Sequence, residues 1–200
     1  MKKLCFIAVA GAFFFCACNN SGNETKNADS VTNVNNKDAE AVVNQPDTSM
    51  KTTVPTVDEK CVEFATKAAN AGMKEIELAK WAQEYGTRQD VKDFAAMMIT
   101  DHTKAADELK QISKTKNITL PVMVPDGVRN DIDKMKTKKS GSDLDKAYVN
   151  EMVSDHKDAV KLFEDASKNA TDADLKNFAA KTLPVLQHHY DGIKAIKARL

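Results

Sequence analysis

Three of the chain's four histidines and one glutamate are the residues whose types and spacing suggest chemistry. Each lies in a different segment with helical periodicity, where a helical wheel places it among alkyl side chains. Helical bundles build metal sites in their cores from such inward-facing groups. Three imidazoles and a carboxylate suit zinc, copper(II) or iron(II). The sequence therefore predicts a core site for a divalent transition metal, or for a small ligand, made of Glu75, His102, His156 and His189.

The positions of these residues relative to the predicted turns place them at similar heights in a bundle. In the first hairpin, the glutamate precedes Thr87 and the histidine follows it at nearly equal separations along the chain. In the second hairpin, the two histidines flank Thr171 in the same way. Each pair of separations differs by only three positions, which corresponds to ~4.5 Å along a helix axis. Side chains can span that difference, so the four groups are expected to meet.

Two aspartates are part of this prediction, and the four core residues also have two other interpretations. Asp101 and Asp155 each precede a histidine and lie at the edge of an apolar stripe, where they are predicted to accept hydrogen bonds from the metal-binding rings. Alternatively, the histidines and Glu75 bond one another in a buried network that fixes helix register. The chain is then a non-catalytic structural or interaction module of the cell envelope. In a third interpretation, these positions are partly exposed.

Motifs of several enzyme classes are absent. Met98 and Met152 stand four residues before two of the histidines, and no glutamate stands three residues before any of them, so the Glu-x-x-His signature of di-iron bundles is missing. No nucleophile elbow, ordered Ser/His/Asp set or Gly-rich phosphate loop occurs either. The sequence therefore favours a protein without enzymatic activity.

Four amphipathic segments must position these residues. Apolar side chains recur at helical spacing, and Gly86 and Thr87 are predicted to end the first helix and cap the second. The segment 118–142 contains two prolines and two glycines and is predicted to be a long connection with a short helix over 128–135. Two short turns and one long connection predict an all-α fold, a ferritin-like four-helix bundle of two αα-hairpins. The predicted helices span 58–85, 87–117, 143–169 and 171–200.

A second apolar face on the first predicted helix has two explanations. Leu78, Trp81 and Tyr85 share this side of the helix. Packing against a neighbouring helix explains it most simply. If the core site is only structural, the same face becomes a candidate surface for a protein partner.

The N-terminus has the features of a lipoprotein signal peptide. Lys2 and Lys3 precede an apolar run from Leu4 to Phe15, which is too short to span a bilayer. Phe15-Cys16-Ala17-Cys18 resembles a bacterial lipobox, and the small Ala17 favours Cys18 as the lipidated residue. We expect a signal peptide over 1–17, lipidation of Cys18, and membrane attachment through that lipid alone. The predicted location is the cell envelope.

The next segment is predicted to be a disordered tether. Residues 18–57 are rich in Asn, Thr, Ser, Asp and Lys and contain no aromatic residue, so they cannot bury enough apolar area to fold. The folded domain is expected over 58–200. Loss of Lys2 and Lys3 with the signal lowers 29 basic residues to 27, against 29 acidic residues. That balance argues against nucleic acid as a partner, and no protein partner is predicted.

Several segments resemble a known family. AANAGMKEIELAKWA, MMITDH, AYVNEMVSDH and TLPVLQHHY are similar to the family called domain of unknown function 4142, over about residues 60–200. The resemblance implies a ferritin-like helical bundle at the cell envelope, with the outer membrane facing the periplasm as the expected location, and leaves the mechanism open. The residues that match the family's motif positions are Glu75, Asp101, His102, Asp155, His156 and His189.

Burial of the histidines would give the protein a defined acid sensitivity. An imidazole among alkyl groups loses hydration when it is charged, so its pKa is expected to fall below ~6.5. Pairing with a carboxylate would have the opposite effect. The sequence favours the first sign, because the stripes around the histidines are mostly alkyl and metal binding requires neutral imidazole.

Overall fold

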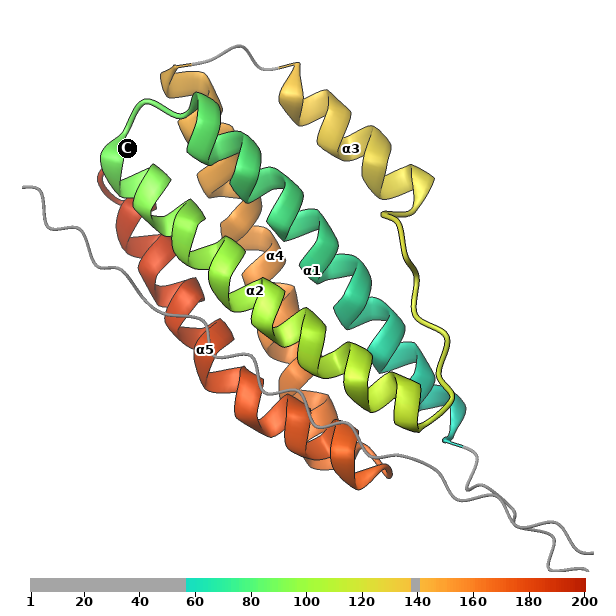
Figure 1. Ribbon diagram of the computed structural model, residues 1–200. Helices are drawn as coiled ribbons and strands as arrows, with labels where there is room; N and C mark the ends of the chain where they lie inside the picture. Colours follow the sequence, from blue (N-terminus) through green and yellow to red (C-terminus); the bar gives the residue numbers. More distant parts are fainter. Residues whose placement is uncertain (1–56, 138–140) are drawn as a thin grey trace, which may run out of the picture. The chain divides into compact units, whose positions relative to one another are not determined.

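The computed structural model describes residues 57–137 and 141–200, which fold into helices joined by loops (Figure 1). The predicted signal peptide, Cys18 and the predicted tether through residue 56 lie outside the described residues. Four long helices lie side by side, and one short helix covers them on one side (Figure 1). In chain order the helices are α1 (Glu59–Tyr85), α2 (Gln89–Thr115), α3 (Asp126–Lys136), α4 (Ser142–Asn169) and α5 (Ala173–Lys197).

The helices pack as two antiparallel hairpins, and the predicted all-α fold is confirmed. α1 packs mainly on α2 and α4 mainly on α5, while α1 also contacts α4 and α2 contacts α5. The start of α4 lies beside the start of α2, where Asp145 contacts Thr87. The end of α2 lies beside the start of α5, where Lys116 pairs with Asp172 at 2.8 Å. The connection between the hairpins therefore runs the length of the bundle, as in ferritin-like folds with one long crossover.

The short helix α3 covers the second apolar face of α1. It packs on α1 and α4, and its Ile132 belongs to the same core cluster as Leu78 and Trp81. Leu78 and Trp81 are buried and Tyr85 is half exposed. The packing explanation of this face is therefore right for Leu78 and Trp81, and the partner-surface explanation is wrong for them.

The buried histidines separate two apolar clusters of the core. One cluster lies at the α1–α2 turn and contains Leu78, Phe94 and Met152, and the other lies at the opposite end and contains Phe64 and Leu109. Along each long helix, Glu75, His102, His156 or His189 falls between members of the two clusters. The core is thus a polar layer between two alkyl and aromatic layers.

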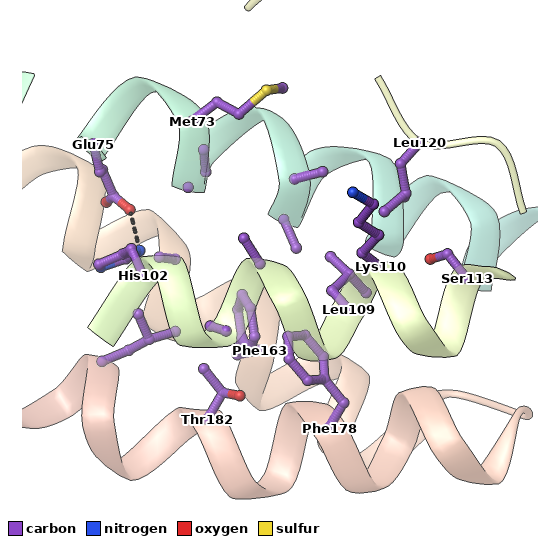
Figure 2. A pocket seen from close by; sticks show the side chains of 18 of the residues that line it. Met73, Glu75, His102, Leu109, Lys110, Ser113, Leu120, Phe163, Phe178 and Thr182 are labelled. Atoms are coloured by element: carbon purple, nitrogen blue, oxygen red, sulfur yellow. Dashed lines mark ion pairs between the residues drawn. The ribbon is translucent and has the colours of Figure 1, made fainter. Parts of the chain in front are cut away.

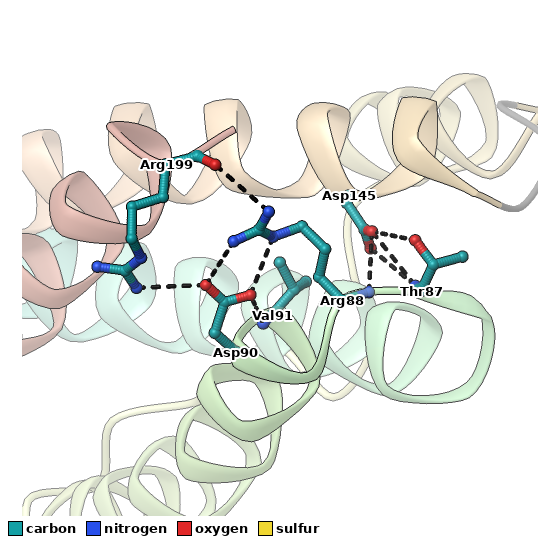
Figure 3. A network of polar contacts seen from close by, with 6 residues as sticks. All are labelled: Thr87, Arg88, Asp90, Val91, Asp145 and Arg199. Carbon is teal, nitrogen blue, oxygen red and sulfur yellow. Dashed lines mark hydrogen bonds and ion pairs between the residues drawn. The ribbon is translucent and has the colours of Figure 1, made fainter.

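The start of α2 is held by a carboxylate from α4. Thr87 was predicted to cap α2 and does not, because the cap position is Arg88, whose side chain makes no capping bond. Asp145, which is fully buried, accepts from the amides of Thr87 and Arg88, both at 3.1 Å, and from the Thr87 hydroxyl at 2.5 Å (Figure 3). A Cβ on Gly86 would approach the Ala82 carbonyl oxygen to 2.5 Å and an Asp145 oxygen to 2.9 Å, so this turn requires glycine. Asp145 therefore supplies acceptors that α2 lacks locally and ties the two hairpins together at the level of the turn.

Candidate metal centre in the bundle core

Four buried ionisable side chains, one from each long helix, meet in the polar layer. Glu75 comes from α1, His102 from α2, His156 from α4 and His189 from α5. His156 and His189 are 0% exposed, Glu75 1% and His102 7%. The three imidazole ring centroids lie 5.4 to 5.8 Å apart. The convergence expected from the helical wheels is present, and the partly exposed interpretation is wrong.

Two of the rings have their protons fixed by groups that only accept hydrogen bonds. His156 Nδ1 lies 2.9 Å from the Met152 carbonyl oxygen, to which it donates. His189 Nε2 lies 2.9 Å from an Asp101 carboxylate oxygen, to which it donates. Because a neutral imidazole carries one proton, the lone pair of each ring is left on its other nitrogen. Those nitrogens are Nε2 of His156 and Nδ1 of His189.

Glu75 lies against the Nδ1 atoms of two of the histidines. One carboxylate oxygen is 3.1 Å from His102 Nδ1 (Figure 2), and the other is 3.6 Å from His156 Nδ1. An ionised Glu75 at this distance favours the proton of neutral His102 on Nδ1, which leaves the lone pair of His102 on Nε2. This is the carboxylate–histidine arrangement that supports metal-binding rings from behind. The contact therefore suits Glu75 to orienting His102 more than to binding an ion itself.

Three ring nitrogens are buried without a hydrogen-bond partner among the described residues: His102 Nε2, His156 Nε2 and His189 Nδ1. One nitrogen from each ring lies within 4.8 Å of those of the other two. Beside an ionised Glu75 all three are acceptors and cannot satisfy one another. With Glu75 protonated, His102 Nε2 can carry the ring proton, but it still has no partner among the described residues. A water molecule donates only two hydrogens, whereas a cation accepts three lone pairs at once. Zinc bound at ~2.0–2.1 Å needs nitrogens ~3.4 Å apart, so the three rings would move closer together around an ion.

The surroundings keep the imidazoles neutral. Loss of hydration lowers the pKa of His102 to about 3 and that of His156 to about 4, and it also lowers the pKa of His189. The sign expected from the sequence is therefore right. Burial raises the pKa of Glu75 to about 8, an effect that Asp155 increases and Lys74 opposes. Neutral imidazole is the form that binds metal.

The two aspartates predicted to assist the histidines have different surroundings. Asp101 contacts His189 on α5, although its sequence neighbour is His102. Asp155 instead accepts from Lys74 at 2.8 Å. It therefore does not support a ring.

Three features of the site were missed by the sequence analysis. Lys74 pairs with both Asp155 and Glu151, at 2.8 and 2.5 Å. The Met152 carbonyl orients His156, and a backbone group gives no signal in a sequence pattern. Tyr148 is fully buried, and its hydroxyl has no partner among the described residues. Burial, together with the charge of Glu75, raises the pKa of this phenol.

A cavity of ≈ 540 Å³ opens beside the polar layer. His102, His189 and Glu75 line one end of it, and alanine, leucine and phenylalanine side chains line most of its length (Figure 2). His156 does not line it. An ion held by the three histidines would therefore be approached by further ligands from the cavity.

Comparisons with known proteins agree with an uncharacterised helical family. Residues 46–196 match the model of a family described as Domain of unknown function (DUF4142). No curated protein matches the sequence. A solved structure, the crystal structure of a DUF305 fragment from Deinococcus radiodurans, is similar with a TM-score of 0.63 and 13% identity, covering 73% of this chain and 100% of that one. At that identity the likeness supports the fold alone. Among residues 57–137 and 141–200, no helix is long and apolar enough to span a membrane.

Proposed function

The chain belongs to the DUF4142 family of domains of unknown function, and we propose that its bundle binds one divalent transition-metal ion through His102, His156 and His189. Glu75 and Asp101 orient His102 and His189 from behind, and the Met152 carbonyl orients His156. Three neutral imidazoles suit zinc, copper(II) or iron(II). A fourth position stays open toward the cavity, as in metal sites that bind exchangeable ligands.

The observation that carries this proposal is the set of three buried nitrogens without partners. A buried acceptor without a hydrogen bond costs ~1–3 kcal/mol, so three together are unfavourable unless something binds them. A self-contained structural network would pair them with donors, and no such donor is found among the described residues. The metal-binding function is therefore favoured over the purely structural one.

A thermal-shift experiment tests this function. Purified protein without a polyhistidine tag is stripped with a chelator, dialysed and melted with and without zinc. At a free concentration of 100 Kd, an ion bound only by the folded state adds about 2.7 kcal/mol of stability. For a chain of this size the expected rise in Tm is about 5–10 °C.

Magnesium is the matched control for this experiment. Mg²⁺ prefers oxygen ligands in octahedral geometry, so it is expected to leave the Tm unchanged. Equal shifts with zinc and magnesium, or no shift with zinc, copper(II) or iron(II), would refute the proposed site.

The two aspartates allow a sharper test. Each precedes a histidine in the sequence, which predicts the same supporting role for both, but in the structure only Asp101 contacts a histidine. Asp101→Asn should lower zinc affinity about 10–100-fold, since it weakens the acceptor that fixes His189. Asp155→Asn should change it much less, because Asp155 pairs with Lys74. Zinc affinities are measured by competition with a chromophoric chelator. If the two variants lose affinity equally, Asp101 has no special role.

We also infer that the protein is a lipoprotein of the cell envelope. The support is the positively charged and apolar N-terminus that ends in Ala17-Cys18. Attachment through lipid on Cys18 follows from this inference. The outer membrane facing the periplasm is the location that the family resemblance implies. Cells fed labelled fatty acid should label the wild-type protein and not Cys18→Ser, and equal labelling of both would rule Cys18 out.

A further inference from the structure

The cavity beside the histidines is elongated and has polar groups of opposite character at its two ends. Its lining on α2 runs from Asp101 and His102 to Ser113 and Lys114. The segment from His102 to Lys114 corresponds to ~18 Å along the helix axis. Between these ends, alanine side chains of α1 and α2, together with Leu109, Phe163 and Phe178, give an alkyl and aromatic surface. Such a shape fits a chain-like apolar molecule better than a compact polar one.

The outer end of the cavity is cationic. Lys110 and Lys114 lie one helical turn apart on α2 and both line the cavity (Figure 2 labels Lys110). Neither has an ion-pair partner among the described residues, whereas Lys116 nearby is paired with Asp172. Val122, 89% exposed, also lines the cavity. An apolar lining next to two cationic side chains is the surface that an anionic amphiphile requires.

A buried hydroxyl at the same end is a second, independent feature. Ser113 also lines the cavity and is 2% exposed. Its Oγ has no hydrogen-bond partner among the described residues, although a helical serine can bond to the carbonyl four residues before it. Figure 2 shows Ser113 on the side of α2 that carries Lys110 and Leu109. This hydroxyl is available to donate to an anionic group held by the lysines.

The inner end of the cavity, beside the histidines, disfavours an anion. Glu75 and Asp101 both line it, and their carboxyl groups disfavour a second anion there. In the metal-free protein a carboxylate is therefore favoured at the outer end over the inner end, which sets the orientation of an amphiphile.

We propose that this cavity binds a medium- to long-chain fatty acid, with its carboxylate at Lys110, Ser113 and Lys114 and its alkyl tail directed toward the histidines. This inference goes beyond metal binding and does not depend on it. It concerns the apolar length of the cavity and its cationic mouth, which the metal proposal does not use.

Calorimetric titration of the full chain, kept metal-free with a chelator, tests the proposal with octanoate, decanoate and dodecanoate. Each methylene buried in the cavity is expected to tighten binding about fourfold, so each step of two carbons should tighten it about 16-fold. Decanol serves as the uncharged counterpart of decanoate. An absence of saturable binding, or an affinity independent of chain length, overturns the proposal.

Gly72→Leu places a side chain inside the cavity without crowding the helix. A Cβ at this position would meet nothing closer than His102 Nδ1, at 4.0 Å. Leucine also favours a helix interior over glycine, so the Tm of the variant is expected to stay equal or rise. Decanoate binding should weaken more than about tenfold. Unchanged decanoate binding in this folded variant would place the ligand elsewhere and overturn the proposal.

The lysines are tested separately from the alkyl lining. Lys110→Ala combined with Lys114→Ala should weaken decanoate about two- to fivefold, the effect of exposed charge pairs, and leave decanol unchanged. Lys104→Ala, an exposed lysine of α2 outside the cavity lining, is the control and should change neither. If decanoate and decanol weaken equally, the carboxylate is not held by these lysines and the assignment fails.

Discussion

Replacement of His156 with alanine is expected to lower zinc affinity by more than about 100-fold. Its ring is 0% exposed, its Nδ1 is fixed by the Met152 carbonyl, and its Nε2 is one of the three unpartnered nitrogens. Removal of a residue that only orients a ligand costs 10–100-fold, so loss of the ligand itself should exceed about 100-fold. Competition with a chromophoric chelator at pH 7 measures the change. Urea unfolding of the metal-free variant verifies that it still folds.

His188 provides a matched control for this experiment. It neighbours His189 on α5 and is exposed, and it lies outside the cluster of the other three histidines. His188→Ala should therefore bind zinc as the wild type does. If His188→Ala loses as much affinity as His156→Ala, zinc is binding to surface histidines and the core site is refuted.

The metal-free protein is expected to be most stable near pH 6.5 and to lose stability on both sides. On the acid side, the histidines have folded pKa values below the unfolded value of 6.5. The unfolded chain therefore binds more protons there, and the stability contributed by the neutral rings is lost as the pH falls below 6.5. On the alkaline side, the pKa of Glu75 rises from 4.5 unfolded to about 8 folded. Its contribution is complete below pH 4.5 and is lost as the pH rises toward 8.

Between pH 4.5 and 6.5 the histidines and Glu75 change the stability in opposite directions. The histidines have the larger effect because there are three of them. Three rings take up protons on unfolding while one carboxyl group releases its proton, a net uptake of about two protons. Each proton changes stability by about 1.4 kcal/mol per pH unit, so the acid limb is the steeper one. Lys74 and Asp155 face the same layer. The pKa of Lys74 is raised from 10.5, so its effect lies above this window, whereas the pKa of Asp155 is raised from 3.8, so Asp155 acts in the same direction as Glu75 and makes the acid limb less steep.

Urea midpoints between pH 5 and 8, measured with a chelator present, test this profile. Glu75→Gln should remove the fall between pH 6.5 and 8 and keep the acid limb. Replacement of the three buried histidines by glutamine should remove the acid limb. A wild-type profile that lacks the acid limb, like that of the triple variant, would mean that the histidines are hydrated, and the buried site would be rejected.

The sequence predicted the fold and the meeting of the histidines because both depend on helical periodicity. Apolar positions at helical spacing define one inward face on each helix, and His102, His156 and His189 each lie on such a face. Short turns fix antiparallel neighbours, so heights can be compared by counting residues from the turns. The predicted helix bounds differ from the observed ones by only a few residues for this reason.

The partner of each ring was not predictable, because it depends on how helices are packed and rotated against one another. Adjacent residues of a helix do not face each other, so Asp101 cannot support His102 and supports His189 across the α2–α5 interface. Asp155 faces α1, where it forms an ion pair with Lys74. Helical periodicity alone predicts Glu75 as a metal ligand. Its contact with His102 Nδ1 instead suits it to orienting the His102 ring, whose other nitrogen is left for the metal.

The cavity gave no signal in the sequence. Alanine and glycine on an inward face usually allow helices to approach closely. Here Gly72 leaves open space beside His102, because a Cβ added to this glycine would meet only the His102 ring, at 4.0 Å. Whether small residues produce close packing or a hollow depends on the helix separation, which the large side chains of other layers set.

The metal content of the purified protein tests the central claim most directly. Wild type and His156→Ala, both without a polyhistidine tag, are dialysed against buffered zinc at pH 7 and measured by elemental analysis. About one zinc per chain in the wild type and almost none in the variant is the expected result. A wild-type chain without zinc, copper or iron, or a variant that retains a full equivalent, would contradict the assignment of His102, His156 and His189 as a metal site.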